Sequence, residues 1–231
     1  MTAAADDRLG VMTNTMRRPD EELKSAVVEE LRWIPSVNST RIVVAVSGGA
    51  VTLTGEVESL PEKVLAVEAV ERVRGVTALA QEIVVHSVWS EVTDTDIAME
   101  AGDAIQRAID VPKTVKVAVH DHVITLSGSV QWHYQLQAAE RAVQYLRGVR
   151  AVANTIAIQP TISTENIKAV IGAALMRDAR IESRRITVSA DSAGVVTLEG
   201  TVDTWPQRRQ VENAAWSAAG ATEVVDHLRI G

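Results

Sequence analysis

The stretch Leu53-Thr54-Gly55 occurs three times in this chain, as Leu126-Ser127-Gly128 and again as Leu198-Glu199-Gly200. The copies lie 73 and then 72 residues apart. In each copy a second glycine follows the first by 20 residues, and these glycines are Gly75, Gly148 and Gly220. A repeat of about 72 residues is too long for one unit of a solenoid and has the size of a small domain. The chain is therefore expected to contain three copies of one compact module.

Alternating apolar residues surround each copy of this triplet. The alternating segments are 42–46 with 51–57, 115–119 with 124–130, and 186–190 with 196–202. Alternation of period two, interrupted by a short turn, predicts a β-hairpin with one buried face. Gly49, His122 and Gly194 occupy the same place in the three turns. Glycine suits the positive φ expected there, so His122 is predicted to be mildly strained.

An amphipathic helix is predicted on either side of each hairpin. The first helix carries apolar residues at helical spacing, namely Leu23, Val27, Val28, Leu31 and Ile34; Ile97, Ala101, Ile105, Ala108 and Ile109; and Ile167, Val170, Ile171, Ala174 and Leu175. Thr95 or Asp96 is expected to cap the first helix of the second module. The second helix follows capping signals at 59–62 and 204–207, whereas 132–135 offers no good N-cap.

A last β-strand is predicted after each second helix, over 76–85, 149–158 and 221–230. Gly75, Gly148 and Gly220 precede these strands and are expected to end the helices as left-handed C-caps. The order predicts an α+β fold of three tandem αββαβ modules, each with two helices packed on a three-stranded mixed sheet. The predicted boundaries are a disordered tail over 1–16 and modules over 17–88, 89–159 and 160–231.

Composition narrows the functional classes. The 231 residues include no cysteine, which excludes disulfides, thiolate chemistry and cysteine zinc sites. The net charge is −7, so nucleic-acid binding through a phosphate-neutralising surface is not expected. Residues 1–8 lack the basic start of a secretory leader, and no apolar run is long enough to span a membrane. We therefore expect a cytoplasmic protein, or a periplasmic one if a leader has been removed.

Each module resembles a BON domain, a family named for bacterial OsmY and nodulation proteins. The resemblance covers residues 19 to 231 and is carried by the element order, by Val51-x-Leu53-x-Gly55 with its two counterparts, and by the later glycine of each repeat. It implies a non-enzymatic module linked to osmotic stress and envelope maintenance, similar to tandem osmotically inducible members that are periplasmic. It also implies contact with phospholipid surfaces, and one cytoplasmic relative binds potassium. The third module departs in having Gly220-Ala221 where the others have Gly-Val.

An interaction edge is predicted between the second strand and the second helix of each module. Trp132, Trp205 and Leu60 occupy this edge, and Arg208 and Arg209 follow Trp205. The aromatic residues either pack within the protein, which is the stronger interpretation because Trp is usually buried, or anchor it to a lipid interface or partner. The arginines lie against the helix dipole, so either salt bridges to nearby Glu or an anionic headgroup would offset the unfavourable contact.

Three further tryptophans are assigned to contacts between modules. Trp33, at the end of the first helix, and Trp89, in a linker, are expected to fill seams between modules. Trp216 lies off the buried stripe of its helix and is expected to pack against a neighbouring module.

The stretch His120-Asp121-His122 is the weak candidate for a metal site. Two histidines at i and i+2 can share a face of a strand, but a stable zinc site needs three or four ligands and the sequence shows no further one. A solvated hairpin turn is the stronger interpretation. We find no catalytic constellation, and no enzyme activity or cofactor is expected.

The sequence therefore favours a non-enzymatic binding protein. It would contact a phospholipid surface or a partner protein through the interaction edge, in an osmotic or envelope stress response. The alternative is a cytoplasmic sensor that binds potassium or another small ligand through backbone carbonyls. The oligomeric state is left open.

Overall fold

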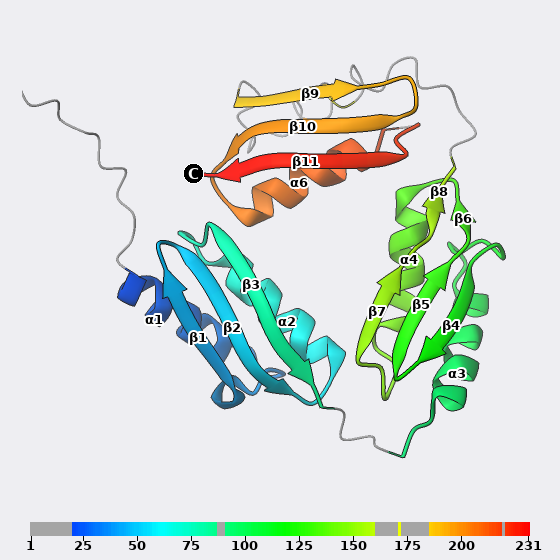
Figure 1. Ribbon diagram of the computed structural model, residues 1–231, viewed down its shortest axis with the longest axis horizontal. Helices are drawn as coiled ribbons and strands as arrows, with labels where there is room; N and C mark the ends of the chain where they lie inside the picture. The colour runs from blue at the N-terminus through cyan, green and yellow to red at the C-terminus, as the bar shows by residue number, and fades with distance from the viewer. Residues whose placement is uncertain (1–19, 87–90, 160–170, 172–184, 219) are drawn as a thin grey trace, which may run out of the picture.

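The computed structural model describes residues 20–86, 91–159, 171, 185–218 and 220–231. Helices and mixed sheets alternate in the same order along the chain, which confirms the predicted α+β fold of tandem αββαβ modules (Figure 1). The tail predicted over 1–16 lies outside the described residues, as do Trp89 and most of the first helix predicted for the third module. Ile171 is the described residue of that helix, and it is buried in the third core.

The elements repeat closely between modules. The first module comprises α1 (Asp20–Arg32), a 3-10 turn η1 (Ser39–Arg41), β1 (Ile42–Ser47), β2 (Ala50–Val57), α2 (Leu60–Arg72) and β3 (Ala78–Val85). The second comprises α3 (Asp94–Arg107), β4 (Lys116–His120), β5 (Val123–Ser127), β6 (Ser129–Val130), α4 (His133–Val143), β7 (Ala151–Asn154) and β8 (Ala157–Ile158). The described part of the third comprises β9 (Ile186–Ala190), β10 (Val195–Val202), α6 (Trp205–Trp216) and β11 (Glu223–Ile230).

Each three-stranded sheet has one antiparallel and one parallel pair. The hairpin strands β1 and β2 are antiparallel, and β3 then joins β2 in parallel after the crossover through α2. The same order holds for β4-β5-β7 and for β9-β10-β11, while β6 and β8 extend the second sheet as a short parallel pair. Three separate cores of Val, Leu, Ile and Ala lie between these sheets and their helices.

The glycine of the repeated triplet is required by a close backbone contact. Gly55, Gly128 and Gly200 have φ values of 135°, 119° and 132°. A Cβ atom on Gly55 would lie 2.1 Å from the carbonyl oxygen of Arg41, and the equivalent distances at the other two glycines are 2.2 and 2.0 Å. Any side chain would therefore collide with the backbone that enters the hairpin, in all three modules alike.

The second set of glycines does not cap the helices as predicted. The second helices end at Arg72, Val143 and Trp216, before Gly75, Gly148 and Gly220 are reached. These glycines, with φ of 102°, 82° and 94°, lie in the turn that leads to the last strand. In the first module this turn is closed by a hydrogen bond from the N–H of Val76 to the carbonyl of Val73.

Three predictions about the first helices are also wrong. Helix α3 is capped by Thr93, not Thr95 or Asp96, because Thr93 and Asp96 form a reciprocal capping box. Ile109 is 99% exposed, since α3 ends at Arg107 and the chain turns away. Trp33 is 82% exposed, so among the described residues it fills no seam, and the contacts between modules that the structure describes lie on the second helices.

Candidate functional site

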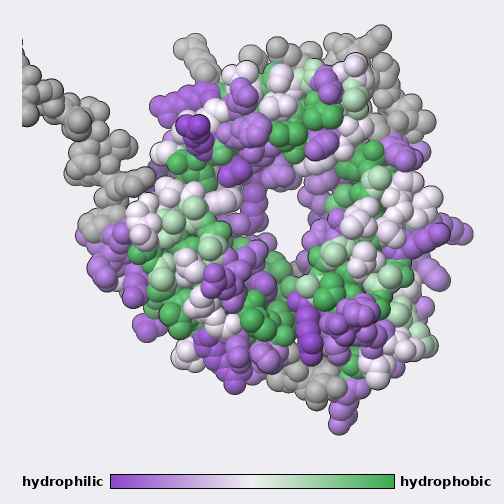
Figure 2. All heavy atoms as spheres, viewed as in Figure 1, coloured by the Kyte–Doolittle hydropathy of each residue, from purple (hydrophilic) through white to green (hydrophobic). Residues whose placement is uncertain are grey.

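The second helices of the three modules, α2, α4 and α6, surround one cavity of about 920 Å³. Figure 1 shows the three modules arranged in a ring with these helices on its inner side, and Figure 2 shows an opening that passes between the modules. Side chains from all three helices line the cavity, with α4 contributing the largest share. Contacts between these helices form three seams, named here by the helices that meet.

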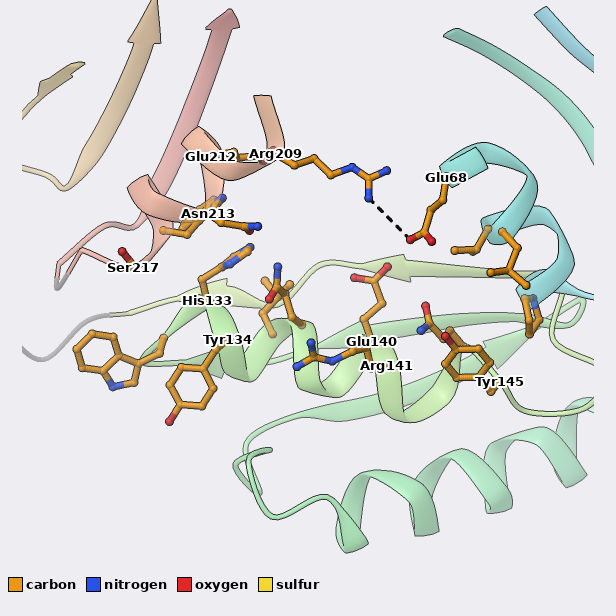
Figure 3. Close-up of a pocket in the computed structure, with 18 residues that line it drawn as sticks. Glu68, His133, Tyr134, Glu140, Arg141, Tyr145, Arg209, Glu212, Asn213 and Ser217 are labelled. Atoms are coloured by element: carbon orange, nitrogen blue, oxygen red, sulfur yellow. Dashed lines mark ion pairs between the residues drawn. The ribbon is translucent and has the colours of Figure 1, made fainter. Parts of the chain in front are cut away.

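The α6/α2 seam joins the third module to the first through charge and apolar packing. Arg209, near the start of α6, forms an ion pair with Glu68 at 3.8 Å (Figure 3). It also forms an ion pair with Glu71, and both glutamates lie in the second half of α2. Trp205 packs against the core of the first module. The guanidinium of Arg208 lies 5.2 Å from the centre of the Trp205 ring. Arg208 also forms a 2.6 Å ion pair through Nε with Asp226 Oδ2.

The α4/α6 seam joins the second module to the third through stacked rings. The His133 ring at the start of α4 lies parallel to the Trp216 ring at the end of α6, with a centroid separation of 4.1 Å and an interplanar angle of 6°. Trp216 thus packs against a neighbouring module, as the sequence predicted. Burial in this seam lowers the pKa of His133 below its usual value, because the charged imidazolium would lose solvent.

The α2/α4 seam joins the first module to the second through apolar contact. Leu60, at the start of α2, packs against the core of the second module. Its position is fixed by the cap that begins the helix: the Ser59 hydroxyl accepts a hydrogen bond from the N–H of Glu62 at 3.3 Å. The Glu62 carboxylate in turn accepts hydrogen bonds from the N–H groups of Asn38 and Glu58 at 2.8 and 2.9 Å.

The structure therefore places most of the predicted interaction edge inside the protein. Leu60 and Trp205 contact the cores of other modules, and Arg208 and Arg209 are paired with carboxylates. These contacts agree with the packing and salt-bridge interpretations. Trp132 lines the central cavity instead. It is the N-cap residue of α4 and makes no side-chain capping bond, as expected; the Gln135 side chain accepts hydrogen bonds from the N–H groups of Gln131 and Trp132.

The His120-Asp121-His122 turn has a structural explanation. Asp121 and His122 have φ of 49° and 63°, which confirms the strain expected at His122. Their N–H groups donate to the Asp94 carboxylate at 2.8 and 2.9 Å, and the bond from His122 lowers the Asp94 pKa. The His122 ring Nδ1 lies 3.1 Å from the Gly148 carbonyl oxygen and donates to it, because a carbonyl oxygen can only accept.

The same arrangement occurs in the first module, where the Asp20 carboxylate accepts hydrogen bonds from the N–H groups of Gly48 and Gly49. In both modules, therefore, a carboxylate at the start of the first helix binds the backbone of the hairpin turn and joins the helix to the hairpin. The His120 ring is exposed beside Asp121. Within the described residues, no group of three or more His, Asp or Glu side chains is placed to hold a metal ion. Among them, too, no helix combines the length and apolar character needed to cross a membrane.

Sequence reasoning missed several residues that the cavity brings together. Tyr134 and Glu140 reach it from α4, Tyr145 from the turn that follows α4, and Glu212 from α6. None of them belongs to the repeated pattern, so comparison of the three modules gives no signal for them. For Tyr134, Glu140 and Glu212, a position on the polar face of a second helix was the available clue.

The repeated αββαβ order and the shared glycine contact define a protein built from three copies of one small α+β domain. The chain belongs to the BON domain family, which matches residues 19–87, 93–160 and 163–231. Osmotically-inducible protein Y of Escherichia coli (strain K12) is 31% identical over 141 residues, which are 58% of this chain and 68% of that protein.

Two solved structures show weaker likeness. The C-terminal domain of CdsD, a structural protein of the type III secretion system of Chlamydia trachomatis, is 13% identical with a TM-score of 0.26, over 90% of this chain and 96% of that one. The PrgH periplasmic domain is 11% identical with a TM-score of 0.20, over 83% of this chain and 95% of that one. Scores this low support no conclusion about the fold or function of this chain.

Proposed function

We propose that this protein is a non-enzymatic binding protein of an osmotic or envelope stress response that contacts phospholipid surfaces or a partner protein. The osmotically inducible relative supports the physiological setting. The exposed apolar side chains Trp33 and Ile109 support the contact, because each lies in the loop after the first helix of its module and is at least four-fifths exposed. This observation carries the proposal, since most of the edge predicted from the sequence is already used in contacts between modules.

The contact is tested by cosedimentation with vesicles of phosphatidylglycerol and phosphatidylcholine at low salt. We expect the full chain to bind, and Trp33→Ser with Ile109→Ser to lose most of that binding, because the aromatic and aliphatic anchors are removed. Met99→Ser is the matched control, since Met99 is also an exposed apolar residue, 69% accessible, but lies on α3. Equal binding by the double variant and the control, or no binding at all, contradicts the lipid contact.

A sensor for a small ligand is the second candidate function. The central cavity favours it, because about 920 Å³ falls within the range of small-molecule sites. Potassium is the ion that the family resemblance suggests. Thermal unfolding in potassium chloride and in sodium chloride at equal ionic strength tests it, since an ion that binds the folded state raises the midpoint. Equal midpoints count against potassium.

A further inference from the structure

We propose that the cavity between α2, α4 and α6 binds a small organic cation with an alkylated ammonium head. The inference rests on the second proposed function, that of a small-ligand sensor, and names the chemistry of the ligand. It is drawn from the charges that remain unpaired in the cavity, from the aromatic rings beside them and from the size of the space.

The charges that line the cavity leave an excess of carboxylate. Arg209 is already neutralised by Glu68 and Glu71 in the α6/α2 seam. Within the described part of the chain, the other charged lining residues, Glu140, Glu212 and Arg141, form no ion pair. Two carboxylates and one exposed guanidinium favour a cation over an anion as the occupant.

Glu140 holds the central position among these groups. Figure 3 shows its side chain extending from the second half of α4 toward the space below Arg209 and Glu68. Tyr134 lies toward one end of α4 and Tyr145 toward the other, so the carboxylate has a phenol ring on either side along the helix. Both tyrosines line the cavity, and both are more than half exposed.

The aromatic lining distinguishes an organic cation from a metal ion. Trp132 and the stacked pair of His133 and Trp216 add further ring surface to the two tyrosines. Rings attract weakly hydrated ammonium groups through their quadrupoles, by about 0.5–2 kcal/mol each. A hard inorganic cation instead needs about six or more oxygen ligands at short range. The cavity also far exceeds the volume of a single ion.

The test measures binding of choline to the full chain by isothermal titration calorimetry, with 3,3-dimethylbutan-1-ol as a neutral analogue of the same shape. We expect choline to bind and the neutral analogue to bind at least about tenfold more weakly, because its head has no charge for the rings and carboxylates to attract. Equal binding of the two compounds, or no binding of choline, overturns the inference. A potassium response without a choline response also overturns it and leaves the sensor function standing.

Glu140→Gln combined with Glu212→Gln locates the site. Both substitutions keep the size of partly exposed side chains, so the fold is expected to persist and its thermal midpoint to stay near that of the parent chain. Choline affinity should fall about tenfold or more, since both charges are removed. Glu82→Gln, on the exposed face of β3, is the matched control and should leave choline binding unchanged. Unchanged choline affinity in the double variant contradicts the assignment.

Discussion

The α6/α2 and α4/α6 seams use similar ends of similar helices but different chemistry. At the α6/α2 seam, Arg209 near the start of α6 pairs with two glutamates of α2, and Trp205 packs against the core of the first module. At α4/α6, the His133 and Trp216 rings stack without an ion pair between them. The three module interiors, in contrast, keep the same alternating core and the same glycine contact.

This difference distinguishes the residues that each module needs in order to fold from the residues that hold the three modules together. A side chain at the triplet glycine would collide with backbone in every module, so the residue cannot vary without distorting the sheet. The seams lie on the second helices, where many pairs of side chains can fill the same gap. The seams have therefore diverged while the interiors have not, and each of the following experiments changes one side of that comparison.

The largest effect is expected at the triplet glycines. Gly55→Ala, Gly128→Ala and Gly200→Ala should each destabilise the protein by about 3 kcal/mol or more, because the new methyl group would meet a backbone carbonyl at a positive φ. Denaturant unfolding followed by circular dichroism measures this. Gly102→Ala is the control, since that glycine lies in α3 with open space around it and alanine favours helices. Similar stability of the control and the three variants would show that the contact is not restrictive.

The next effect is expected at the α6/α2 seam. Trp205→Ala should lower the free energy of unfolding by about 2 kcal/mol, because the substitution removes a partly buried ring that packs against the core of the first module. Trp132→Ala should cost less than about 1 kcal/mol, since Trp132 lines the open cavity and packs against no described core. Thermal unfolding of both variants measures the difference. Equal losses would mean that the two edges contribute alike.

The internal structure of each module was predictable from the sequence. Alternating Val and Leu at 51–57 and its counterparts determine the strands, and the Ser59 and Thr204 capping signals place the starts of α2 and α6. Errors fell at helix ends, where Thr93 capped α3 two residues earlier than the Thr95 alternative. They arise because several neighbouring Thr and Asp side chains can accept the same capping bond, and only the completed box decides between them.

The cavity was not predictable in the same way. Its lining comes from three helices that are about 70 residues apart in the chain. The repeated pattern predicts each module but not the relative positions of the modules. Trp205 and Trp216 were recognised as candidates for packing, but their partners, the first core and His133, follow only from the arrangement of the modules. Trp33 shows the reverse error, since it was assigned to a seam between modules but is 82% exposed.

A smaller effect is expected from the charges of the α6/α2 seam. Arg209→Gln should destabilise the protein by about 0.5–1 kcal/mol in low salt, because partly exposed ion pairs contribute little. The loss should shrink as sodium chloride is raised, since salt screens the pair. A double-mutant cycle with Glu68→Gln and Glu71→Gln isolates the coupling. A coupling near zero at low salt would assign the seam to Trp205 alone.

The smallest effect is expected at the α4/α6 seam and depends on pH. Burial lowers the pKa of His133, so below the usual value of about 6.5 the unfolded chain binds a proton that the folded protein does not. The free energy of unfolding should therefore fall as pH drops through this window, by less than about 1 kcal/mol because the ring is only partly buried. Two carboxylates and two guanidinium groups, those of Glu140, Glu212, Arg141 and Arg209, line the same cavity.

His133→Phe isolates this contribution, because it keeps a flat ring opposite Trp216 and removes the titrating group. The free energy of unfolding is measured for the parent and for the variant from pH 7.5 to pH 5. The other four histidines contribute equally to both proteins. Their difference therefore reports His133 alone, and the variant should gain relative stability toward pH 5. Parallel pH curves would mean that the imidazolium is tolerated in the seam, through attraction to the Trp216 ring face or to Glu212. In that case the α4/α6 and α6/α2 seams would be chemically more alike than their contacts indicate. Each would then join its modules through a cation, the His133 imidazolium in one and the Arg209 guanidinium in the other.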